Sequence, residues 1–122
     1  MTRLWLAIAG LAGFASVMAG ALAAHAGGDL RTAELLRTGA LYGMVHAVAL
    51  VAVIALAQGR EPRRGPATVA GWSFAAGIVL FSFSLFALAA GAGRWLGWIT
   101  PFGGVALMLG WAALAVLALR RR

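Results

Sequence analysis

The stretch GALYGMVHAVALVAVIALA, residues 39–57, contains no charged side chain and is long enough to decide the fold. An α-helix rises about 1.5 Å per residue, so about 20 apolar residues cross the roughly 30 Å of hydrocarbon in a bilayer. The stretch lacks the strict alternation of apolar and polar residues that a strand of a membrane barrel requires. It therefore predicts a transmembrane helix.

Three further apolar runs lie on either side of this stretch, at residues 4–24, 67–90 and 99–119. Each is close to the length of one membrane crossing. A bilayer interior accepts only helices or closed barrels, because every backbone polar group must find its hydrogen bond within the protein. The sequence predicts an all-α membrane protein, a single domain over residues 1–122 built as a bundle of four transmembrane helices.

Composition supports the same class. Of the 122 residues, 63% are hydrophobic and 11% are charged, whereas soluble domains are about half apolar and about a quarter charged. The surface of so apolar a chain needs the lipid bilayer as its partner. The absence of cysteine excludes disulfides and thiolate metal sites.

The ten basic residues are all arginines, and they lie at the ends of the apolar runs. Because they do not form a stripe with aromatic residues, we expect no nucleic-acid partner. Seven of them fall on one side of the predicted bundle and three on the other. The positive-inside rule then places both termini in the cytoplasm of a bacterial cell, with the chain in the cytoplasmic (inner) membrane. The seven are Arg3, Arg60, Arg63, Arg64, Arg120, Arg121 and Arg122, and the three are Arg31, Arg37 and Arg94.

The first run resembles a secretory signal peptide, with Arg3 before it and the small residues Ala24 and Ala26 around its end. It is longer than the apolar region of a typical signal peptide, so we expect it to be retained as a helix.

The connection between the first two runs carries a second pattern. Residues 29–37 combine Asp29, a residue type that caps helices, with apolar residues at helical spacing. We predict a short amphipathic helix lying on the outer surface between helices one and two. A solvated loop is the alternative.

Polar residues inside the apolar runs are candidates for function, because placing them in lipid is costly. Tyr42 and His46 are four residues apart and share one helix face. With the predicted orientation, the polar groups gather in the outer leaflet as one cluster. A hydrogen bond within the bundle, ligand or proton handling, and metal binding all remain open for His46. The candidate cluster consists of His25, Tyr42, His46, Ser82, Ser84 and Thr100.

Small residues predict close helix packing. The first run carries such residues at every fourth position, namely Ala12, Ser16, Gly20 and Ala24. The fourth run contributes Gly103, Gly104 and Gly110. The sequence leaves open whether these residues pack inside the bundle or against a second copy.

These motifs together resemble the domain-of-unknown-function family 423, whose eukaryotic relative is transmembrane protein 256. The resemblance runs nearly end to end. It rests on Gly20–His25, Tyr42 with His46, Leu80–Phe86, Thr100–Gly104 and Gly110-Trp111. It implies a four-helix membrane protein of unestablished activity.

Two residues depart from the family pattern. Phe83 stands where glycine is usual, and Phe86 stands where tyrosine is usual. The first change implies a filled space between helices, and the second removes a hydroxyl.

No catalytic constellation is visible, because no serine accompanies a histidine and a carboxylate and no pair of carboxylates lies in a run. Two histidines with no nearby second carboxylate are a weak metal set, so we expect neither a metal nor a cofactor. The sequence favours a non-enzymatic accessory or oligomeric membrane component that acts through helix contacts, with itself or a larger membrane complex as partner. The alternative is a small transporter or channel for an ion, metabolite or lipid that uses the outer polar cluster.

Overall fold

The computed structural model describes residues 1–25, 29–58 and 64–120, and these ranges contain helices and no strand. Four helical spans in them are long and apolar enough to cross a membrane. The predicted four-helix membrane bundle is thereby confirmed. The elements in chain order are α1 (Thr2–His25), α2 (Leu30–Ala57), α3 (Arg64–Gly77), the π-helical segment η2 (Ile78–Phe83), α4 (Ser84–Ala89), the 3₁₀ helix η3 (Arg94–Trp98) and α5 (Thr100–Leu119).

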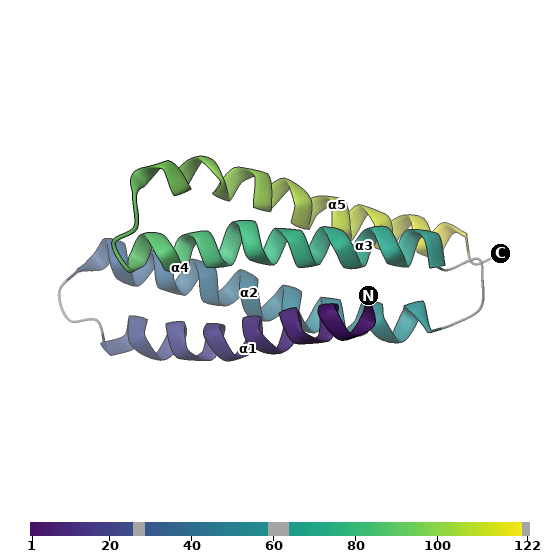
Figure 1. Cartoon of the computed structure of the whole chain (residues 1–122), viewed down its shortest axis with the longest axis horizontal. Coiled ribbons are helices and arrows are strands. Elements are labelled where there is room, and N and C mark those ends of the chain that lie inside the picture. Colours follow the sequence, from purple (N-terminus) through teal and green to yellow (C-terminus); the bar gives the residue numbers. More distant parts are fainter. Residues whose placement is uncertain (26–28, 59–63, 121–122) are drawn as a thin grey trace.

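The helices form two antiparallel pairs that lie side by side (Figure 1). One pair is α1 with α2, and the other is α5 with the continuous rod of α3, η2 and α4. Contacts of α2 with α3, η2 and α4 join the pairs, so α2 and the rod are central while α1 and α5 are outermost. The start of α1 and the end of α5 lie at the same end of the bundle (Figure 1).

The side of the membrane that this shared end faces stays a prediction. The arginines at positions 60, 63, 121 and 122, on which much of the predicted orientation depends, lie outside the described residues.

The separate amphipathic helix between helices one and two is not confirmed. Residues 30–37 instead form the first turns of α2, which continues to Ala57 without a break. Asp29 caps this helix as expected, since its carboxylate accepts hydrogen bonds from the backbone N–H groups of Arg31 and Thr32. The helix also passes through Gly39, where the ring of Phe86 packs closely against the backbone. This packing offsets the weak helix propensity of glycine.

Aromatic rings lie on glycines at several helix contacts. A side chain added at Gly110 would meet the Phe74 ring at 2.5 Å, and one added at Gly39 would meet the Phe86 ring at 2.6 Å. At the end of the bundle that holds the start of α1, the Trp5 ring lies on Gly71 and meets the edge of Trp72. Trp5 is 1% exposed, so it belongs to the core and not to the lipid interface.

Of the glycine contacts, the one at Gly103 brings two backbones closest and joins α5 to η2. A β-carbon added at Gly103 would lie 2.6 Å from the carbonyl carbon of Leu80 and 2.8 Å from the α-carbon of Phe81. One turn further along α5, the Leu107 side chain fills the space at Gly77, where the π-helical segment begins. The π-helix is therefore the part of the rod against which α5 packs without an intervening side chain.

We expect Gly103→Ala to lower the free energy of unfolding by about 1–3 kcal/mol, because its methyl group would press on backbone atoms that cannot rotate away. Gly104→Ala is a matched control, since its added carbon would lie at an ordinary 3.7 Å from the Phe81 ring. Chemical unfolding in mixed micelles measures the free energy of unfolding of both variants. Equal stability of the two would contradict the close approach of α5 to η2.

We expect Asp29→Ala to fray the first turn of α2, with Glu34→Ala as an exposed acidic control on the same helix. Hydrogen bonds from the Thr32 hydroxyl and from backbone N–H groups hold the pKa of Asp29 below its usual range. The cap is therefore intact at neutral pH, and it is lost as the pH falls through this lowered pKa. Hydrogen exchange of the amides near residues 31–33 at neutral and acid pH measures the effect. Unchanged protection in Asp29→Ala would show that the cap is dispensable.

Candidate functional site

His46 lies at the centre of the bundle on α2, and both of its ring nitrogens are hydrogen-bonded inside the protein. Nδ1 donates to the backbone carbonyl oxygen of Tyr42, 2.6 Å away. The indole N–H of Trp111 donates to Nε2 over 3.0 Å. A carbonyl can only accept and an indole N–H can only donate, so the two bonds fix the neutral ring with its proton on Nδ1.

Aromatic rings surround this histidine. Tyr42 lies parallel to it, with ring centroids 5.9 Å apart, and Phe74 and Trp111 have centroids at 5.6 Å and 5.9 Å. His46 is 5% exposed, whereas Trp111 is 47% exposed and Tyr42 is 42% exposed. The two partner rings thus separate the histidine from the bundle surface.

This geometry limits the chemistry of His46. A metal ion or an added proton would have to displace one of the two hydrogen bonds, because neither ring nitrogen has a free lone pair. Among the described residues, no group of three or more histidine, aspartate or glutamate side chains is placed to hold a metal ion. The arrangement stabilises the contact between α2 and α5, two helices whose bonded residues are 65 positions apart in the chain.

A second polar contact joins α4 to the start of α5. The Ser84 hydroxyl lies 2.7 Å from the Thr100 hydroxyl and also donates toward the carbonyls of Leu80 and Phe81. Each hydroxyl carries one proton, so with Ser84 donating to the carbonyls, Thr100 donates to the Ser84 oxygen, and the carbonyl oxygen of Leu96 lies 3.3 Å from the Thr100 hydroxyl. Ser84 and Thr100 therefore satisfy each other and the end of the π-helical segment, and neither points to a ligand.

A third polar site was not foreseen as such. Ser16 on α1 and Ser82 on η2 both face Gly43 of α2: a side chain added there would contact the Ser16 oxygen and lie 3.2 Å from the Ser82 oxygen. The two serines are 3% and 1% exposed. Within the described ranges, neither hydroxyl has a hydrogen-bond partner. The sequence signal for this site is that Ser16 is a polar residue in the middle of an otherwise apolar run; its place in the series of small residues indicates packing alone.

The predicted polar cluster is therefore divided in the structure. Tyr42 joins His46, Ser84 joins Thr100, and Ser82 lies with Ser16. His25 is exposed at the end of α1 and takes part in none of these contacts.

The predicted packing residues are also divided. Ala12 and Ser16 are buried, but the buried face of α1 continues through Ala19 and Ala23, not through Gly20 and Ala24. Residues spaced by four lie about 40° further around a helix at each step. The series from Ala12 to Ala24 therefore moves away from the contact face as it proceeds along α1. On α5, Gly103 and Gly110 face η2 and Phe74, and Gly104 is in ordinary contact with Phe81.

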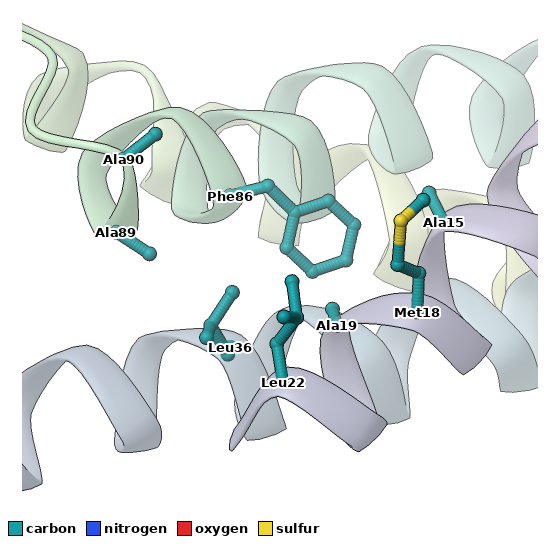
Figure 2. Close-up of a pocket in the computed structure, with 8 residues that line it drawn as sticks. All are labelled: Ala15, Met18, Ala19, Leu22, Leu36, Phe86, Ala89 and Ala90. Carbon is teal, nitrogen blue, oxygen red and sulfur yellow. The ribbon is translucent and has the colours of Figure 1, made fainter. Parts of the chain in front are cut away.

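An apolar groove of about 310 Å³ opens between α1, α2 and α4. Figure 2 shows the Phe86 ring projecting from α4 into the space above α1 and α2, with Met18 and Leu22 of α1 opposite it. The groove exists because α1 contacts α3 near the start of the chain but has little contact with α4 at the other end. Its walls are Ala15, Met18, Ala19, Leu22, Leu36, Phe86, Ala89 and Ala90.

Comparison with known proteins assigns the chain to a family. A family model described as a protein of unknown function, DUF423, matches residues 19–104. A UPF0382 membrane protein of Haemophilus influenzae is 39% identical, over 94% of this chain and 93% of its own length. The Bacillus subtilis UPF0382 membrane protein YwdK is 42% identical over 71% of this chain and 70% of its own length. The Escherichia coli K12 UPF0382 inner membrane protein YgdD is 32% identical over 98% of this chain and 92% of its own length. No solved structure matches the chain.

We expect Trp111→Phe to lower the free energy of unfolding by about 1–2 kcal/mol, because it keeps an aromatic ring but leaves His46 Nε2 without a donor. Trp98→Phe is the control, since Trp98 is 79% exposed. Denaturation in the same detergent measures the difference in the free energy of unfolding between the two variants. If Trp111→Phe were as stable as the control, the hydrogen bond to His46 would have no structural role.

Proposed function

The chain belongs to the DUF423 family of membrane proteins, and on that premise we propose that it is a non-enzymatic component of the bacterial inner membrane that acts through lateral helix contacts. Its partner is a second copy or a helix of a larger membrane complex. The observation that carries this proposal is a set of glycines on α1 that no part of the bundle uses.

These glycines are Gly10, Gly13 and Gly20. A side chain added at any of them would meet no atom within 4 Å, whereas those at Gly43, Gly71 and Gly103 face close neighbours. Gly13 and Gly20 are seven residues apart, or about two helical turns, so they lie on one side of α1. We call this side the glycine flank.

Small residues on a membrane helix let another backbone approach closely, and this is how such helices associate without a hydrophobic driving force. The glycine flank offers that surface toward lipid. Gly20 and Ala24, which the buried face of α1 leaves out, extend it toward the end of the helix.

The closed interior also supports a contact role over the alternative of a small transporter or channel. That alternative was based on an open polar cluster around His46. With both ring nitrogens of His46 bonded to Tyr42 and Trp111, His46 itself offers no free nitrogen to a passing ion or metabolite. The alternative thereby loses its main motivation.

Paired substitution of the glycine flank tests the proposal. We expect Gly13→Leu with Gly20→Leu to weaken association at least about tenfold, a change of about 1.4 kcal/mol, without loss of fold, because both added side chains project into open space. Ala21→Leu is the control, since Ala21 is exposed on the same helix and about 100° away from Gly20. Single-molecule photobleaching in nanodiscs counts copies, and co-purification in mild detergent detects other partners.

A wild-type protein that is strictly monomeric and free of partners would contradict the proposal. So would a paired glycine variant that associates as well as the Ala21→Leu control.

A further inference from the structure

The two unpartnered serine hydroxyls lie one helical turn from the apolar groove. Gly39 and Gly43 are successive turns on the same face of α2. The Phe86 ring covers Gly39, and Ser16 and Ser82 cover Gly43. Since Phe86 also lines the groove, the groove comes within one turn of Gly43 along α2.

The rod and α1 also place the serine pair next to the groove. On α4 and η2, Ser82 precedes the groove residue Phe86 by four positions. On α1, Ser16 lies between the groove residues Ala15 and Ala19. The rod and α1 run in the same direction and α2 runs against them (Figure 1), so the steps from Phe86 to Ser82 and from Gly39 to Gly43 point the same way. The groove and the serine pair therefore lie side by side between α1, α2 and the rod.

A buried hydroxyl without a hydrogen-bond partner costs about 1–3 kcal/mol. Here two such hydroxyls face the backbone of Gly43, with each serine at least 97% buried. Helical serines usually satisfy themselves on the carbonyl one turn back, as Ser84 does. Ser16 and Ser82 instead leave their hydrogen-bonding capacity free beside Gly43, one turn along α2 from the place where the groove-lining ring of Phe86 covers Gly39.

We propose that the groove and the serine pair form one binding site for an uncharged, single-chain membrane amphiphile. Its hydrocarbon chain lies along the groove walls between α1 and α4, and its hydroxyl or carbonyl end bonds to Ser16 and Ser82. An apolar pocket with a few convergent polar groups is the usual form of a small-molecule site, and its volume of about 310 Å³ lies within the usual range.

The polar end of the ligand must be uncharged. The groove is lined by apolar residues and the serine pair offers two neutral hydroxyls. An ionised headgroup placed there would lack a counter-charge, which is prohibitive in a medium of low dielectric constant. An ordinary phospholipid can therefore place an acyl chain in the groove but cannot bring its headgroup to the serines.

Phe86 acts as the gate of this site. Its ring stands on Gly39, one turn along α2 from the serine pair, and extends into the groove in Figure 2. Rotation of the ring away from Gly39 would join the groove to the serine pair. The proposal thus predicts that the polar end enters only when this ring moves.

Photolabelling of the full-length protein tests the site. The probe is a hexadecanol analogue with a diazirine near its hydroxyl end, added to nanodiscs of phosphatidylethanolamine and phosphatidylglycerol. We expect saturable labelling near Ser16, Gly43 and Ser82 that excess hexadecanol displaces and hexadecane does not. The double substitution Ser16→Ala with Ser82→Ala should reduce this labelling about tenfold, as the loss of two neutral hydrogen bonds predicts. Ser73→Ala, on the same rod, should leave it unchanged.

Two further measurements keep the test independent of folding. Hexadecanol should raise the unfolding temperature of the wild type and not that of the double serine variant, which itself should be folded because it loses no hydrogen bond of the bundle. Phe86→Ala should increase labelling near the serines.

The proposal is overturned if labelling of the double serine variant equals that of the wild type. It is also overturned if both probe and hydrocarbon reach only groove residues such as Met18 and Leu22, which would indicate surrounding lipid alone. A lack of any hexadecanol effect would mean that the serine pair holds at most a water molecule. None of these results depends on the glycine flank, which uses other residues of α1.

Discussion

The structure depends on the close approach of helix backbones at glycine. Lipid tails are as apolar as the helices, so burial of apolar surface drives membrane helices together only weakly, and direct packing must hold the bundle. At Gly103 the backbone of α5 meets the backbone of η2, and at Gly110 and Gly71 aromatic rings fill the space that a side chain would need. These contacts position α5 and α1 against the rod of α3, η2 and α4. Polar contacts form only where this packing brings the polar side chains within reach of each other.

One consequence is that most polar groups in the interior are already bonded. Close packing of α5 on the rod brings Trp111 to His46 and Thr100 to Ser84, and each pair satisfies its own members. Among the described residues, the exceptions are the serine pair at Gly43 and the indole N–H of Trp5, which is buried without a hydrogen-bond partner. The uncommitted features of the molecule, the glycine flank and the groove with its serine pair, both involve α1. This helix packs on α2 and touches the other pair mainly at α3.

The sequence predicted the parts of the fold that depend on local chemistry. Hydropathy gave four spans, and the residue type of Asp29 predicted its cap. Hydropathy does not determine register, so the contact of Trp111 with His46 could not be read from the chain. The continuous α2 was missed because charged residues at 31–37 suggested a surface segment, although no proline interrupts residues 29–57. The predicted polar cluster was divided because residues at one depth can face different neighbours, and a four-residue spacing on α1 diverged from its true contact face.

The central claim is that the polar centre of the bundle is closed and that interactions take place on the lipid-facing side. The chain holds two histidines, one exposed at the end of α1 and one in the centre of α2, which gives a direct internal comparison. Water-edited solid-state NMR of histidine-labelled protein in lipid bilayers measures how fast magnetisation passes from water to each ring. The account predicts rapid transfer to His25 and slow transfer to His46, whose Nδ1 carries the proton. Equally rapid transfer to both rings would mean that water reaches the centre of the bundle, and would contradict the account.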